Sequence, residues 1–189
     1  MSIIYVGNYK NRFLKIIQVI KEQTPKTVLE LCFGDTFIAD YCYKNSISWQ
    51  GIDINGNFVK RARKKGFDSI CSDILLVDSF IKNDMCIISG SLYHFNPEQR
   101  VNLFQKMFSS TNKILISEPI NNLSENKGLV GYIAKRSANA GNGHTYFRYN
   151  KQSLKTVLDE LSVYFSFTYK IIGFVKKDMI VLIEKNAAN

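Results

Sequence analysis

Short apolar runs alternate with amphipathic helical segments along most of this sequence. Runs of this length that lie between turn residues are typical of buried strands. Five runs are predicted to be strands: Thr27–Leu31, Ile47–Asp53, Ser69–Ser72, Met85–Ser89 and Lys113–Ser117. Because consecutive parallel strands need a crossover connection, this alternation predicts right-handed crossovers and a mainly parallel sheet that helices cover on both faces.

The segments between and around these runs have helical periodicity. Asn55 and Asn96 are expected N-caps, Pro97 suits a first helical position, and Gly66 suits a helix end. The predicted helices are Tyr9–Gln23, Phe37–Cys42, Phe58–Lys65, Pro97–Phe108 and Ser153–Leu161.

Two apolar runs at the end of the sequence lie too close together for a parallel crossover. They span Val163–Phe174 and Met179–Glu184, and only Val175–Asp178 separates them, which favours a hairpin. The predicted fold class is therefore α/β, a doubly wound, mainly parallel seven-stranded sheet with a C-terminal antiparallel hairpin in a three-layer α/β/α arrangement. We expect one domain over residues 1–189, with an N-terminal helix within 1–25 and an inserted loop over 121–150.

Size and composition agree with one globular domain. The chain has 189 residues, of which 46% are hydrophobic, enough for one full core. No stretch approaches the roughly 18 apolar residues of a membrane-spanning helix, and the first residues do not resemble a signal peptide, so we expect a soluble, cytoplasmic protein. The net charge of +9 suits an anionic partner but does not distinguish nucleic acid, a phosphorylated metabolite or simple solubility.

The cysteine and histidine residues do not indicate a metal site. Cys32, Cys42, Cys71 and Cys86 form no C-x-x-C pair, and neither histidine stands beside a cysteine. We expect reduced cysteines in the core and no structural zinc.

Acidic residues and a glycine that could bind a ligand lie at the carboxyl ends of the predicted strands. In an open α/β sheet, ligands bind beyond the carboxyl ends of the strands, where the strand order reverses. Glu30 and Gly34 lie at the end of the first strand, and Asp53, 19 positions after Gly34, ends the second. This separation is close to the roughly 20 residues at which an acidic side chain binds ribose hydroxyls, although Asp53 could instead be only a helix cap.

This ordered set resembles the class I S-adenosylmethionine-dependent methyltransferases across nearly the whole chain. In that family an acidic-x-Gly-x-Gly-x-Gly turn after the first strand holds the methionine part of the cofactor. Glu30, Cys32, Gly34 and Thr36 occupy those places, so cysteine and threonine replace the first and third glycines. The resemblance implies S-adenosylmethionine as cofactor and S-adenosylhomocysteine as product.

The resemblance also assigns the other strand ends. It places Asp53 on the ribose, Asp73 on the adenine amine and Ser89 beside the methyl group. Three neighbours complete the predicted cofactor-binding set: Ile54, Ser72 and Ile74.

Both histidines fall in segments expected to cover the methyl group. His94 follows the fourth strand and His144 lies in the inserted loop, and either could act as the general base that removes the acceptor proton. Tyr93 and Tyr146 would shape the acceptor pocket, and Arg148 would pair with an acidic group on the acceptor.

Each of these interpretations has a structural alternative. His94 could cap the following helix, and His144 and Arg148 could only tie the loop to the sheet. Tyr9 and Arg12 could close over the cofactor or pack on the surface. Five basic residues on one helix are expected to form a solvated outer face: Lys60, Arg61, Arg63, Lys64 and Lys65.

The sequence therefore predicts a methyltransferase that acts on a small metabolite or sugar hydroxyl bearing an acidic group. One alternative is an RNA or protein methyltransferase that uses the basic surface. The other is a non-catalytic binding or interaction protein, which the replaced glycines at Cys32 and Thr36 would favour.

Overall fold

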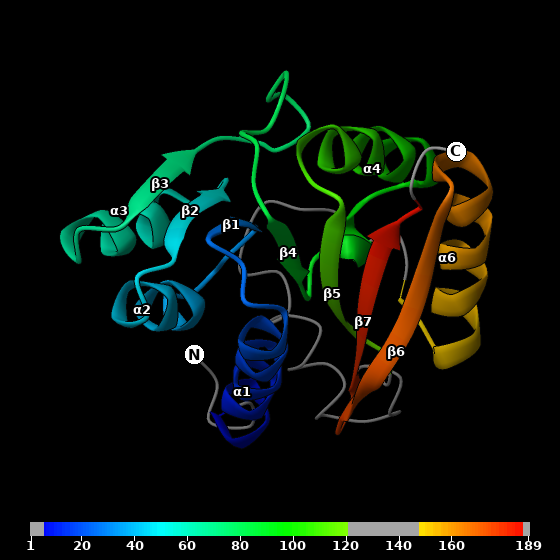
Figure 1. Ribbon diagram of the computed structural model, residues 1–189, viewed down its shortest axis with the longest axis horizontal. Coiled ribbons are helices and arrows are strands. Elements are labelled where there is room, and N and C mark those ends of the chain that lie inside the picture. Colours follow the sequence, from blue (N-terminus) through cyan, green and yellow to red (C-terminus); the bar gives the residue numbers. More distant parts are fainter. Residues whose placement is uncertain (1–5, 121–147, 187–189) are drawn as a thin grey trace, which may run out of the picture.

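The computed structural model describes residues 6–120 and 148–186, which form one seven-stranded sheet between two layers of helices (Figure 1). The strands lie in the order β3-β2-β1-β4-β5-β7-β6, and every neighbouring pair is parallel except β5–β7 and β7–β6. The strands are β1 (Thr27–Leu31), β2 (Ser48–Asp53), β3 (Asp68–Cys71), β4 (Met85–Ser89), β5 (Lys113–Pro119), β6 (Phe167–Val175) and β7 (Asp178–Lys185). The predicted fold class is confirmed.

The helices divide between the two faces of the sheet. The helices are α1 (Val6–Gln23), α2 (Phe37–Lys44), α3 (Gly56–Lys64), α4 (Pro97–Ser110) and α6 (Lys151–Phe165), with a short 3-10 helix η2 (Leu92–His94). Apolar residues of α1, α2 and α3 pack with one side of the strands, and those of α4 and α6 with the other. Because both faces are covered, the central strands β1 and β4 are almost wholly buried, which explains their continuous apolar sequence.

The expected caps begin two of the helices. The Asn55 side chain accepts a hydrogen bond from the backbone N–H of Asn57 at the start of α3. Asn96 and Gln99 form a capping box at the start of α4. The alternative that His94 caps this helix is therefore wrong, as is the idea that Asp53 is the cap of α3.

The boundary between the last helix and the hairpin differs from the prediction. Residues 163–165 belong to α6 and not to a strand, and β6 begins at Phe167 after Ser166 adopts a left-handed conformation. The helical spacing continues through Leu158, Leu161 and Phe165, all of which pack on the α4 side of the core. An apolar run alone could not separate these two structures. The antiparallel pairing of β6 with β7 is confirmed.

The cysteine prediction holds only in part. All four cysteines are free, and Cys42 and Cys86 are buried, but Cys71 is exposed. It lies on β3, which forms one edge of the sheet and has most of its side chains exposed to solvent. In the described ranges no helix has the length and apolar content needed to cross a bilayer.

Candidate functional site

The loop after β1 keeps a glycine-like path where a cysteine stands. Cys32 has a φ of +54° and Gly34 a φ of +57°, both in the left-handed region that glycine adopts most easily. The backbone N–H of Cys32 donates to the carbonyl of Ile52 at 2.7 Å, which ties the loop to β2. The first glycine of the family pattern has therefore been replaced without loss of the backbone turn.

Thr36, at the third glycine position, is accommodated away from this turn. It begins α2, and its hydroxyl donates to Asp40 at 3.2 Å and accepts from the Lys65 ammonium at 2.7 Å. The side chain is thus held by α2 and the residue after α3.

Asp53 joins the loops that follow β1 and β2. One carboxylate oxygen accepts from the backbone N–H of Gly34 at 3.0 Å, and the other accepts from that of Asn55 at 2.7 Å. Burial raises the pKa of Asp53 above its ordinary value, and the two backbone N–H groups oppose this rise. The predicted ribose-binding carboxylate is therefore in direct contact with the predicted glycine turn.

The residues on the predicted adenine side differ in exposure. Ile54 is 62% exposed beside Asp53, whereas the Ile74 side chain is buried in the core. Asp73 accepts a hydrogen bond from the backbone N–H of Leu75 at 2.9 Å. The Ser72 N–H donates to the Asp53 carbonyl at 3.1 Å, so the loops after β2 and β3 also meet.

Glu30 is fully buried on the α1–α3 side of β1. Its Oε2 accepts from the Trp49 indole N–H at 2.9 Å, and its Oε1 has no hydrogen-bond partner among the described residues. Burial raises the pKa of Glu30 well above its usual value, against the effect of the Trp49 hydrogen bond. Buried polar atoms in folded proteins usually have a hydrogen-bond partner, so this oxygen is a candidate contact for a ligand.

The loop after β4 meets the loop after β1. The Ser91 hydroxyl donates to the Ser89 carbonyl at 3.2 Å. Burial raises the pKa of the Cys32 thiol to about 12, and the nearby Ser91 side chain opposes this rise. The Ser89 hydroxyl is buried without a partner in the described part of the chain. Gly90 has a φ of +62°, and a Cβ there would lie 2.7 Å from Nη1 of Arg12, so α1 approaches this loop closely.

Three of the five predicted acceptor-side residues lie together. The rings of Tyr93 and His94 are 4.1 Å apart between centroids, and the Arg148 guanidinium lies over the Tyr93 ring at 5.9 Å. His144 and Tyr146 lie outside the described residues, so the structure does not place them.

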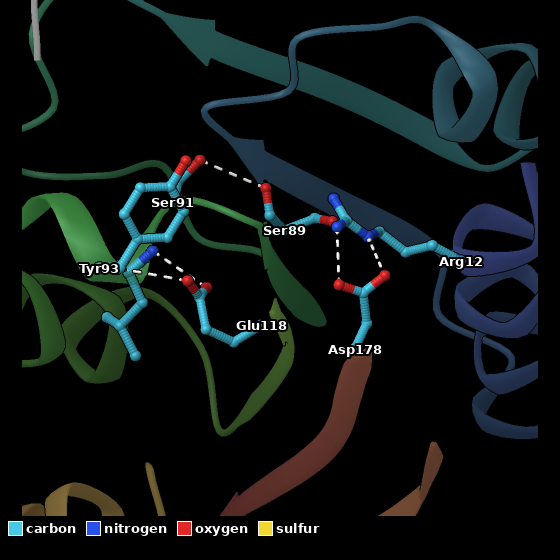
Figure 2. Close-up of polar contacts among 7 residues, drawn as sticks. Arg12, Ser89, Ser91, Tyr93, Glu118 and Asp178 are labelled. Atoms are coloured by element: carbon cyan, nitrogen blue, oxygen red, sulfur yellow. Dashed lines mark hydrogen bonds and ion pairs between the residues drawn. The ribbon is translucent and has the colours of Figure 1, made fainter. Parts of the chain in front are cut away.

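The sequence analysis missed two acidic residues at this edge of the sheet, and it left open whether Arg12 closes over the cofactor or packs on the surface (Figure 2). Glu118 near the end of β5 is completely buried and accepts from the backbone N–H groups of Leu92 and Tyr93. Arg12 on α1 forms a two-pronged ion pair with Asp178 on β7 at 2.8 and 2.9 Å. Glu118 could have been found, because it is an acid directly after a predicted strand. Asp178 could not, because it reaches this edge only through the antiparallel β7.

The basic residues of α3 lie on its outer side. Lys60, Arg61 and Lys64 are exposed, as are Arg63, which donates to the Ser69 carbonyl, and Lys65, which pairs with Asp40 at 2.8 Å. Across residues 6–120 and 148–186, no three His, Cys, Asp or Glu side chains group closely enough to bind a metal ion.

Solved structures of S-adenosylmethionine-dependent methyltransferases share the fold of this protein over nearly the whole chain. The methyltransferase domain of bacterial CtHen1 matches with a TM-score of 0.71 and 13% identity, over 92% of this chain and 97% of that domain. The magnesium protoporphyrin IX methyltransferase ChlM from Synechocystis PCC 6803, solved with bound SAH, matches with a TM-score of 0.70 and 12% identity, over 98% and 88% of the two chains. The chain has the fold of the class I S-adenosylmethionine-dependent methyltransferases.

A third solved structure with this fold contains two bound small molecules. The plantazolicin methyltransferase BpumL, in complex with a pentazolic desmethylPZN analog and SAH, matches with a TM-score of 0.72 and 16% identity, over 96% of this chain and 89% of that chain. The sequence itself matches no protein-family model and no curated protein. The methyltransferase resemblance is therefore carried by the fold.

Proposed function

We propose that this chain transfers the methyl group of S-adenosylmethionine to a small acceptor that carries an acidic group, either a metabolite or a sugar hydroxyl. The observation that carries the proposal is the contact between Asp53 and Gly34. In this methyltransferase fold, it joins the strand-two carboxylate to the turn after β1, at the point where the strand order reverses.

The residues at this edge fit the cofactor. Gly34 places no side chain at the middle of the turn. Glu30 Oε1 and Ser89 Oγ, which have no partner among the described residues, offer hydrogen-bonding capacity on β1 and β4. Asp53 would hold the ribose, and the exposed Ile54 would pack on the adenine face. The remaining proposed cofactor contacts are Cys32, Ser72, Asp73 and Ile74. When bound, the cofactor supplies the activated carbon–sulfur bond, and the chain must orient the acceptor in line with it.

The proposed acceptor side includes Tyr93, His94 and Arg148. The guanidinium of Arg148 suits an acidic group, and the Tyr93 ring beside it provides a flat apolar wall. His94 or His144 would take the proton of an acceptor hydroxyl, and Tyr146 would complete the pocket. The similar structures are named for acceptors of different kinds, namely magnesium protoporphyrin IX, plantazolicin and small RNA, so the proposed acceptor rests on the residues of this chain.

One observation favours a second candidate, a methyltransferase that acts on RNA or an acidic protein. Helices α1, α2 and α3 together carry nine Lys and Arg against two Asp and Glu, whereas α4 and α6 carry four against three. One helical layer is therefore strongly positive. A steep decrease of RNA binding with salt would favour this candidate, because each phosphate contact releases counterions.

Calorimetric titration with S-adenosylmethionine and with S-adenosylhomocysteine tests the proposal. We expect both to bind. Failure of both to bind at millimolar concentration would overturn the enzyme assignment and leave a non-catalytic interaction protein.

Turnover measurements on histidine variants test the proposed base. With a panel of hydroxy acids and sugar nucleotides as acceptors, His94→Ala or His144→Ala should lower the rate by roughly 10²–10⁴ at whichever residue acts. Near-normal rates in both variants would show that neither histidine removes the proton.

A further inference from the structure

We propose that Glu118 is a positioning residue that holds the turn Leu92–His94 through both of its carboxylate oxygens and so places Tyr93 and His94 at the acceptor end of the site. The acceptor role of this turn rests on the proposed function, but the contact between Glu118 and the turn does not.

Glu118 satisfies two backbone groups that the turn cannot satisfy itself. Within the turn, the N–H of His94 donates to Ser91 and that of Phe95 to Leu92. The first N–H groups of a helical turn have no partner inside it. Those of Leu92 and Tyr93 donate instead to Glu118, at 3.1 Å to Oε2 and 3.3 Å to Oε1. Figure 2 shows the Glu118 carboxyl group beside Tyr93, with dashed lines for the two contacts.

The position of Glu118 is itself rigid. It is completely buried on β5, which pairs with β4 on one side and β7 on the other. The N–H of Gly90 also donates to the Ser117 carbonyl at 2.7 Å. A small movement of the Glu118 carboxyl group would therefore move the turn relative to a fixed sheet.

The charge of Glu118 decides how well it can hold the turn. An ionised carboxylate accepts on both oxygens, whereas a protonated carboxyl group has one oxygen that must donate. Burial raises the pKa of Glu118 to about 8, and the two backbone donors and Arg12 oppose this rise. Charged and titratable groups face it from four directions: Arg12 on α1, Asp178 on β7, Cys32 after β1 and Tyr149 before α6. The turn should be held by both oxygens above about pH 8 and less firmly below it.

The effect should fall on the acceptor side. Tyr93 contacts both His94 and Arg148, so a shift of the turn moves Tyr93 and His94 together and changes the contact with Arg148. The loops after β1 and β4 meet, but within residues 6–120 and 148–186 neither Asp53 nor Gly34 hydrogen-bonds to Leu92, Tyr93 or His94. Glu118 should therefore alter acceptor kinetics and leave the affinity for S-adenosylhomocysteine within about threefold of the wild-type value.

A pH titration followed by NMR tests the contact directly. In the wild-type protein, the amide proton shifts of Leu92 and Tyr93 should titrate together between pH 6 and 9.5, with the same midpoint as the side-chain carboxyl carbon of Glu118. In Glu118→Gln the amide titration should disappear. The exposed Glu184→Gln, on β7, is the matched control and should retain it.

The outcomes are separable. Amide shifts that do not change with pH in the wild-type protein, or that titrate equally in Glu118→Gln, would overturn the proposal. If Glu118→Gln does not fold, the carboxyl carbon of the wild-type protein still reports whether Glu118 and the two amides titrate together. Once an acceptor is known, kcat of the wild-type protein should increase as the pH rises through about 8, because the turn is then held by both oxygens. This increase should be lost in Glu118→Gln. Failure of the wild-type protein to bind S-adenosylhomocysteine would reject the proposed function but would not alter the NMR result.

Discussion

Replacement of Asp53 by alanine should weaken both the fold and cofactor binding. The change removes two hydrogen bonds to backbone N–H groups, at 3.0 Å to Gly34 and 2.7 Å to Asn55. Hydrogen bonds to a charged group contribute about 1.5–3 kcal/mol each. Both donors are only half-buried, so water can replace part of each bond. We therefore expect the free energy of unfolding to fall by about 3 kcal/mol.

The same carboxylate is the proposed partner of the ribose hydroxyls. Its loss should cost about 1–3 kcal/mol of binding, which is roughly a 5- to 150-fold weaker affinity for S-adenosylhomocysteine. Asp53→Asn keeps one acceptor oxygen and should lie between alanine and the wild type in both measurements. Urea denaturation measures the first effect, and calorimetry at a temperature where each variant is folded measures the second.

Asp68→Asn is a suitable control, because Asp68 is an exposed acid at the start of the neighbouring strand β3. It should bind S-adenosylhomocysteine as the wild type does. An unchanged affinity in both Asp53 variants would refute the ribose assignment. An unchanged stability would show that the Asp53 contacts with Gly34 and Asn55 do not couple the two loops.

Three further changes probe the same edge of the sheet. Arg12→Ala leaves the carboxylate of Asp178, which is 1% exposed, without its ion-pair partner, and should lower stability by about 3–5 kcal/mol in urea denaturation; a loss below about 1 kcal/mol would contradict a buried pair. Cys32 has a left-handed φ that glycine adopts without strain, so Cys32→Gly should keep the stability and the S-adenosylhomocysteine affinity of the wild type. The β-branched Cys32→Val should lose about 1–2 kcal/mol of the free energy of unfolding. A tenfold weaker affinity in Cys32→Gly would show that the thiol itself contacts the ligand. The pKa of Glu118 is about 8 in the folded protein, whereas its ordinary value, expected in the unfolded chain, is 4.5. As the pH rises, the unfolded chain therefore loses the Glu118 proton at a lower pH than the folded protein does. The stability advantage of the wild type over Glu118→Gln should therefore be greatest below pH 4.5 and decrease up to about pH 8; an advantage independent of pH would mean that Glu118 titrates normally.

Local patterns were sufficient for most of the fold. Buried apolar runs located β1, β2, β4 and β5, and the caps Asn55 and Asn96 located the starts of α3 and α4. The short spacing after the last helix predicted the antiparallel hairpin. The error at residues 163–165 arose because an apolar run at a helix end has no period of its own to distinguish it from a strand.

The sequence predicted those site residues that lie at the ends of the first strands, where their order along the chain indicates their position in the sheet. Gly34 and Asp53 were singled out from their spacing, and the structure brings them into contact. Glu118 was missed although it directly follows the predicted fifth strand, which in the structure continues two residues further, to Pro119. The exposure of Cys71 was missed because the sequence does not show which strand lies at the edge of the sheet.

The sequence by itself determined the order of the elements, the parallel character of the sheet, the residues that end β1, β2 and β4, and the end of β3 to within one residue. Only the tertiary structure decided that Arg12 and Asp178, which are 166 positions apart, form a buried pair near Gly90, and that Glu118 holds the turn after β4. The physical reason is that periodicity and turn residues report local backbone preference and the apolar face of an element. The protonation of a buried carboxyl group depends instead on which distant charges and backbone donors the closed sheet brings beside it.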